Sequence, residues 1–273
     1  MEILRLGPDD LDDCLALARS RGWAPDRRKW RLIFQVGEIS GLRAPDGALA
    51  GCVALTRYGD ALAAVGMMLV SERFGRQGLG GRLMEHVLAV AGPATVFLYA
   101  TALGRPLYER LGFRAIATVT TSAGPFSGPA DGGTRPAADG DAAAIRALDA
   151  RALGGDRTAL LDGLLPLADA VRVIERDGAV AGYGAAREGG GQLAIGPLVA
   201  PDLDTARALI ADLAAPAGGV VRMDIDDRHD GLLAWAQARG LAPADRTWLM
   251  VHGDRELPGD PAWSGLPAML AVG

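Results

Sequence analysis

The chain has 273 residues, which is enough for one large domain or two domains of ordinary size. Its hydrophobic content of 49% supports sizeable cores, and its net charge of −5 argues against a nucleic-acid-binding protein. No apolar run reaches the ~20 residues that cross a bilayer, and charged residues interrupt the apolar runs near the start of the chain. We therefore predict a cytoplasmic protein with neither a nucleic-acid partner nor a membrane partner.

The first part of the chain predicts a strand, two helices and a hairpin. The predicted elements are a strand at Met1–Leu6, a helix from Leu11, a helix at Arg27–Val36, and strands at Ile39–Leu42 and Leu49–Tyr58. Pro45-Asp46-Gly47 supplies the turn between the two hairpin strands.

A glycine-rich loop follows the next predicted strand, Asp60–Val70, and leads into a helix. The loop glycines are Gly75, Gly78, Gly80 and Gly81. Glycines let a backbone approach a ligand closely, and the first turn of a helix offers unpaired N–H groups and partial positive charge. The loop therefore suits a pyrophosphate. No Gly-Lys-Ser/Thr follows, which excludes a P-loop, and the glycine spacing does not fit a Rossmann fingerprint.

A second motif comes after a short predicted strand at Val96–Tyr99. Residues 107–113 read LYERLGF, with Tyr108 four residues before Gly112-Phe113. This motif resembles the later motif of the GNAT N-acetyltransferase superfamily, and Gly75-Arg76-Gln77-Gly78-Leu79-Gly80 resembles that family's acetyl-CoA pyrophosphate loop. The resemblance covers roughly residues 1–120. It implies an enzyme that moves an acetyl group from acetyl-CoA to an amine acceptor.

The resemblance also implies which residues bind the co-substrate. These candidates are Met68, Leu69, Val70, Gly75, Arg76, Gln77, Gly78, Leu79, Gly80, Gly81, Thr101 and Tyr108. Two of them depart from the family pattern. Gly75 stands where Gln or Arg is usual, with Arg73 and Arg76 close enough to supply charge, and Thr101 stands where the family often has Asn but keeps a hydroxyl.

Tyr108 is the candidate general acid for the departing thiolate, because a phenol stays protonated near neutral pH. A surface position on an amphipathic helix is the alternative for Tyr108. Glu38 is the candidate catalytic base, with Glu72 as a second carboxylate, and both could instead be solvated. Trp23 and Trp30 either line the acceptor pocket or belong to the core.

No metal or redox centre is predicted. Cys14 and Cys52 lie in a predicted helix and a predicted strand without metal-ligand spacing, so we expect buried free thiols. His86 is expected to be structural, and His229 and His252 are isolated. The acidic run Asp224–Asp230 resembles a metal cluster in composition, but strand-end capping and solvation explain it more simply.

The order of elements then repeats, which predicts a tandem duplication. The repeat comprises helices at Ala142–Leu153, Thr158–Leu165, Leu203–Ala214 and Leu232–Ala238, and strands at Val171–Arg176, Val180–Ala186, Gln192–Val199, Val220–Ile225 and Trp248–Val251. The predicted fold is α/β with a mixed α+β sheet: two GNAT-like domains, each a mostly antiparallel twisted sheet flanked by helices. Their bounds are 1–120 and 135–253, with a linker at 121–134 and a C-terminal tail at 254–273 whose role the sequence leaves open.

The second copy lacks the chemistry of the first. In place of the glycine loop it has Val199–Asp204, in which Pro201 removes an amide donor and two aspartates repel a pyrophosphate. Ala236 aligns with Tyr108. We predict that this copy is degenerate and has lost co-substrate binding.

Two alternatives to an enzyme stay open at this stage: a non-catalytic acyl-CoA sensor, and a scaffold in which the loop is only structural. The acceptor is expected to be a small molecule, although a protein amine stays open because acceptor loops vary freely in this fold. The chain is expected to be a monomer or a homodimer.

Overall fold

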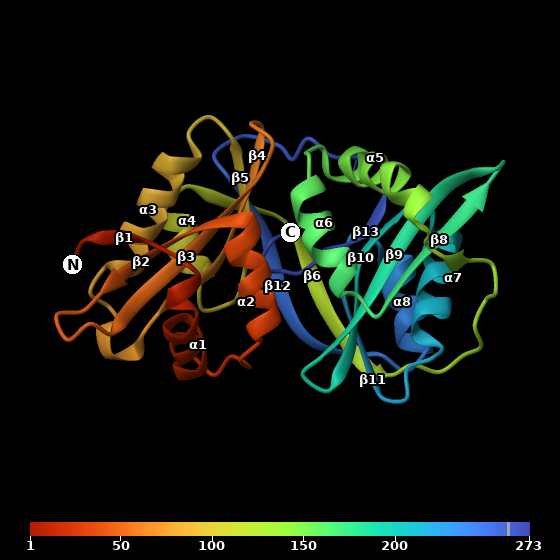
Figure 1. Cartoon of the computed structure of the whole chain (residues 1–273), viewed down its shortest axis with the longest axis horizontal. Coiled ribbons are helices and arrows are strands. Elements are labelled where there is room, and N and C mark those ends of the chain that lie inside the picture. Colours follow the sequence, from red (N-terminus) through yellow and green to blue (C-terminus); the bar gives the residue numbers. More distant parts are fainter. Residues whose placement is uncertain (261–262) are drawn as a thin grey trace.

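The computed structural model describes residues 1–260 and 263–273 and shows two halves side by side (Figure 1). The first half contains β1 (Ile3–Leu6), α1 (Leu11–Ser20), α2 (Arg27–Val36), β2 (Gly37–Arg43), β3 (Leu49–Tyr58), β4 (Leu62–Val70), α3 (Leu79–Ala91), β5 (Thr95–Ala100), α4 (Arg105–Arg110) and β6 (Phe113–Pro125). The elements from β1 to β5 fall where the sequence predicts them. β6, however, extends through Thr121–Pro125, which the sequence assigned to the linker.

The second half repeats this order with α5 and α6 in place of α1 and α2. It contains β7 (Arg135–Pro136), α5 (Ala142–Leu153), α6 (Thr158–Leu164), β8 (Ala170–Arg176), β9 (Ala179–Gly189), β10 (Gln192–Ala200), α7 (Leu203–Ala214), β11 (Val220–Asp226), α8 (Asp230–Ala238), β12 (Ala242–His252) and β13 (Ser264–Leu266). The predicted mixed α/β fold with two tandem units is confirmed. None of the helices in the described ranges is long and apolar enough to cross a membrane.

The two halves share one continuous sheet, in the order β1-β2-β3-β4-β5-β12-β6-β11-β10-β9-β8-β7. Strand β12 of the second half lies between β5 and β6, and β6 of the first half lies between β12 and β11. Each half therefore inserts its last long strand into the sheet of the other. The sequence predicts two separate sheets, and the exchange joins them into one.

Helices cover both faces of the first half. α3 and α4 pack on one face, over a core that includes Leu55, Val65 and Leu83. α1 and α2 pack on the other face, where Trp30 is buried and Leu160 of α6 joins the same core. We call these the α3 face and the α2 face. Cys14 and Cys52 are buried and free, as predicted.

Neighbouring parallel strands separate at two equivalent places. β4 pairs with β5 only from Leu62 to Val65, and β10 pairs with β11 only from Gln192 to Ile195. Beyond these residues the strands diverge. We call the first place the first split and the second place the second split.

Candidate functional site

The loop before α3 presents a row of backbone donors. Gly78 has a left-handed conformation (φ 77°) and caps the helix, and Arg76 is also left-handed (φ 60°). The N–H of Arg82 is bonded to the carbonyl of Gly78 at 3.1 Å, whereas no described residue accepts a hydrogen bond from the N–H groups of residues 76–81. These donors lie at the positive end of the helix dipole, so the loop suits an anion.

The loop also has room and a cation available. Residues 75–78 are exposed, and a Cβ atom on Gly81 would meet nothing within 4 Å. The guanidinium of Arg73 pairs with Asp46. Arg76, in contrast, forms no ion pair with any residue in the described ranges, so its charge is free to face a phosphate.

Three predicted parts of the site meet at Gly80. A Cβ atom there would lie 3.1 Å from Cδ2 of Leu107 in α4 and 3.2 Å from Cε of Met68 in β4. The end of β4, the start of α3 and the start of α4 are therefore in mutual contact. This contact brings the glycine loop and the Tyr108 motif to one place, although 27 positions separate Gly80 from Leu107 in the sequence.

The end of β4 offers an open strand edge at this place. Beyond Val65, the described chain contains no strand paired with the β5-facing edge of β4. Met67 has a positive φ of 50° at a shift in register against β3, and Cys52 donates its thiol hydrogen to the Met67 carbonyl at a sulfur–oxygen distance of 3.6 Å. β4 is therefore bulged next to the first split.

Tyr108 lies beside the first split on the α3 face. Its side chain is buried, and its ring packs edge-on against Phe113 with a centroid distance of 5.9 Å. Its hydroxyl makes no hydrogen bond with the described residues. Burial raises the pKa of Tyr108 to about 12, so the phenol keeps its proton throughout the neutral range.

The comparisons with known proteins decide the family. Models described as "Acetyltransferase (GNAT) domain" match residues 39–115 and residues 145–262. The chain is also 30% identical, over 239 residues, to the uncharacterized N-acetyltransferase YitH of Bacillus subtilis (strain 168), which spans 85% of this chain and 84% of the relative. The chain belongs to the GNAT acetyltransferase family. It is a GNAT-type N-acetyltransferase with two tandem GNAT domains.

Solved structures agree at the level of the fold. A putative acetyltransferase from Pyrococcus horikoshii superposes with a TM-score of 0.82 at 18% identity, covering 100% of this chain and 95% of that one. A tandem GNAT protein from the clavulanic acid biosynthesis pathway gives a TM-score of 0.67 at 18% identity, covering 93% and 99% of the two chains. The GNAT family implies an acyl-CoA co-substrate, which the free amides of the glycine loop would fit.

Thr101 and the two tryptophans take different places around this site. The Thr101 hydroxyl accepts a hydrogen bond from the Gly104 N–H at 3.2 Å and so holds the turn before α4. Trp30 is core, with 1% of its surface exposed, whereas Trp23 is 38% exposed and has the amine of Lys29 5.7 Å from its ring centre. Of the two, only Trp23 is accessible to an acceptor.

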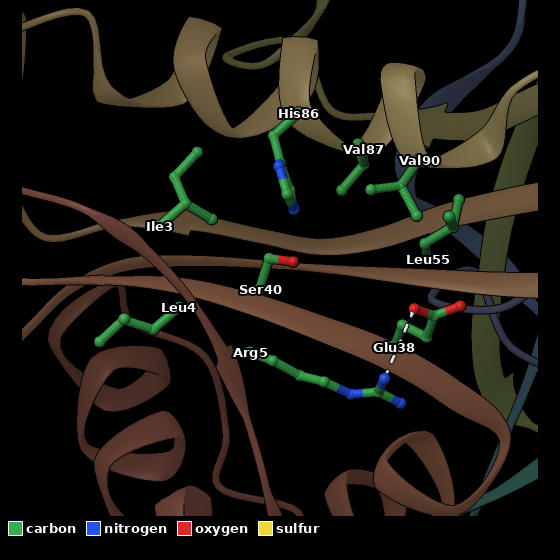
Figure 2. Close-up of a pocket in the computed structure, with 9 residues that line it drawn as sticks. All are labelled: Ile3, Leu4, Arg5, Glu38, Ser40, Leu55, His86, Val87 and Val90. Atoms are coloured by element: carbon green, nitrogen blue, oxygen red, sulfur yellow. Dashed lines mark ion pairs between the residues drawn. The ribbon is translucent and has the colours of Figure 1, made fainter.

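Glu38 lines a pocket together with residues of β1, β3 and α3, among them Leu55 and His86 (Figure 2). In the sheet, Glu38 of β2 pairs with Leu55 of β3, and Leu55 pairs with Val65 of β4. The three side chains therefore point to the same side of the sheet, the α3 face. The Glu38 carboxylate is 3.9 Å from Arg5 and 3.7 Å from Arg57. Arg57 also bonds the Ala91 carbonyl at the last residue of α3. The glycine loop is at the other end of α3, a helix about 20 Å long. A role of Glu38 as the base stays a prediction.

We expect Glu38→Gln to leave kcat within about twofold and the free energy of unfolding within about 1 kcal/mol, because both ion pairs are partly exposed. Steady-state kinetics and urea denaturation would measure the two effects. A fall in kcat of more than about tenfold would instead support Glu38 as the base.

The second half presents a different surface at the corresponding positions. The Asp202 carboxylate accepts a hydrogen bond from the Thr205 N–H at 2.8 Å, so the start of α7 is capped by the chain itself. Arg176 donates to the same carboxylate and holds the pKa of Asp202 at about 2. In the second split, β13 pairs with Leu198–Ala200 of β10. The helix start and the strand edge that are open in the first half are thus both occupied by the chain itself in the second half.

The acidic run at the end of β11 is paired with polar and basic side chains. Asp224 bonds Arg222 and Thr121, and Asp226 bonds Arg228. These contacts hold β11 and its turn and account for the charges without a ligand.

Proposed function

We propose that the first half binds acetyl-CoA and transfers the acetyl group directly to an amine acceptor, with Tyr108 as the general acid. The convergence of β4, α3 and α4 at Gly80 carries this proposal. At Gly80 the glycine loop, with its six free amides, meets the end of β4 and the helix α4 that carries Tyr108. We propose further that the acceptor is a small molecule.

The residues divide the reaction between them. The loop amides hold the pyrophosphate, and the open edge of β4 at Met68–Val70 pairs with the pantetheine arm. The acceptor nitrogen attacks the thioester carbon, a C–N bond forms, and the C–S bond breaks. Tyr108 gives its proton to the leaving sulfur, and the amine loses a proton to solvent or to a base. Because the pKa of Tyr108 is about 12, the acid is fully protonated at the start of each turnover.

The second half is proposed to bind no acetyl-CoA. The Asp202 carboxylate takes the position at the helix start that a phosphate would need, and two like charges there would repel. β13 takes the edge of β10 that a pantetheine arm would need. The expected stoichiometry is one acetyl-CoA per chain.

Isothermal titration of acetyl-CoA into the wild type and into Gly81→Asp tests the co-substrate site. A Cβ at Gly81 meets open space, and a carboxylate in the first turn favours the helix dipole, so the variant should fold. The carboxylate would face the pyrophosphate, and we expect Kd to rise by at least about tenfold, which corresponds to ~1.4 kcal/mol.

Gly81→Asn is the matched control, because it has the same shape without the charge. We expect its Kd to stay within about threefold of the wild-type value. Equal Kd values of the Asp and Asn variants for acetyl-CoA would show that the loop does not bind the pyrophosphate. Absence of acetyl-CoA binding by the wild type would overturn the proposed function.

A further inference from the structure

The segment of residues 263–273 connects the two splits. It enters the second split as β13, and a Cβ atom on Gly196, the first residue after the paired part of β10, would collide with the Pro267 carbonyl. The segment then crosses to the first half and ends between the halves, at the point marked C in Figure 1. There, a Cβ atom on Gly66, the first residue after the paired part of β4, would collide with the Ala271 carbonyl.

The segment covers the first split on the α2 face. Ala268 and Val272 belong to the core of that face, and Val272 is fully buried. Gly273 lies against β5, because a Cβ atom on it would be 2.6 Å from Cζ of Phe97. Tyr108 belongs to the core of the opposite face. The general acid and the segment therefore stand on opposite sides of the first split.

Side chains from both halves hold the segment in place. The Tyr58 hydroxyl of β3 donates to the Val272 carbonyl. Arg157, just before α6, donates to the Gly273 carbonyl at 2.6 Å. The same guanidinium is fixed by Asp149 of α5 through bonds of 2.8 Å and 2.6 Å, and both side chains are buried. Because buried donors are costly to leave unpaired, these bonds hold the segment in its position at the first split.

We propose that residues 269–273 form the acceptor-side wall of the transfer site, and that the second half positions this wall through Asp149 and Arg157. This inference rests on the proposed function. Residues 264–273 read SGLPAMLAVG and contain no charged side chain. An apolar wall at the split favours compact amines with an uncharged, apolar substituent next to the nitrogen, and it blocks bulky acceptors.

The test compares the wild type with a variant that lacks residues 268–273 and keeps β13. The readout is the ratio of kcat/KM for two primary amines that differ only in bulk, taken from those that the wild type acetylates. We expect the ratio of bulky to compact amine to rise by at least about tenfold, while Kd for acetyl-CoA is unchanged. An unchanged ratio in a variant that still binds acetyl-CoA would overturn the inference.

Tyr58→Phe tests the same wall without shortening the chain. It removes only the hydrogen bond to Val272, and we expect the ratio to rise about threefold through KM for the amine, with KM for acetyl-CoA unchanged. If the shortened chain does not fold, Tyr58→Phe alone tests the inference. An unchanged ratio of kcat/KM for the bulky and compact amines in this variant would then contradict it.

Gly265→Ala in β13 is the control within the segment, since its Cβ would make an ordinary 3.4 Å contact with the Leu198 carbonyl. Its ratio should equal that of the wild type. A wild type that binds acetyl-CoA but acetylates no amine would defeat the proposed function itself, and the inference with it. That result is distinct from an unchanged ratio in active variants.

Discussion

Replacement of Tyr108 by Phe is expected to lower kcat by about 10²-fold or more and to leave Kd for acetyl-CoA within about twofold. The ring packs against Phe113 and Gly104, and phenylalanine keeps those contacts. Only the hydroxyl is lost, and no described residue depends on it for a hydrogen bond. Steady-state kinetics and calorimetry on the same preparation would separate the two effects.

The pH dependence gives an independent check on Tyr108. Burial raises its pKa to about 12, so the acid is lost only as the pH approaches that value. The wild type should show no fall in kcat from this group between pH 6 and 10, since its acid form dominates far below the pKa. A Phe variant as active as the wild type would show that another group protonates the sulfur.

Replacement of Arg157 by Ala is expected to lower the free energy of unfolding by about 3–5 kcal/mol. The carboxylate of Asp149 is fully buried and pairs with Arg157, so the variant would leave a buried charge without its partner. Tyr183 also donates to Asp149, and one neutral donor does not replace a guanidinium. Urea denaturation followed by circular dichroism would measure the loss.

The pair of Arg146 and Asp162 supplies a matched control for this experiment. It joins α5 to α6 as the buried pair does, but its side chains are 40% and 51% exposed. Arg146→Ala should cost less than about 1 kcal/mol. Similar losses for the two arginine variants would mean that Arg157 contributes no more than a surface charge.

Local patterns were sufficient for most of the fold. The bounds of α2, α5 and α7 follow from caps and apolar spacing within each helix, such as the Asp26 carboxylate that accepts from the Lys29 N–H. The glycine loop could be found because its function needs glycines and a helix start next to each other in the sequence. The meeting of this loop with Tyr108 followed from the family resemblance.

Features that depend on distant pairing were outside the reach of these patterns. The exchange of β6 and β12 joins residues more than a hundred positions apart, such as Phe113 and His252, and no local pattern encodes a partner strand. The same limit applies to Glu38. The sequence named Glu38 as a candidate base, and only the register against Leu55 shows which face of the sheet its side chain takes.

The exchanged strands also determine how the chain can come apart. If the first half unfolded alone, β12 would lose both of its partner strands and β11 would become a sheet edge, so their unpaired N–H and C=O groups would face water. Partial unfolding is therefore unfavourable, and the chain should melt as one cooperative unit despite its two-domain ancestry. Residues 126–134 act as a short tether that keeps each inserted strand at a high effective concentration near its partner. Because both halves belong to one chain, the exchange of β6 and β12 is an intramolecular association, whereas two separate chains would need a bimolecular step to form it.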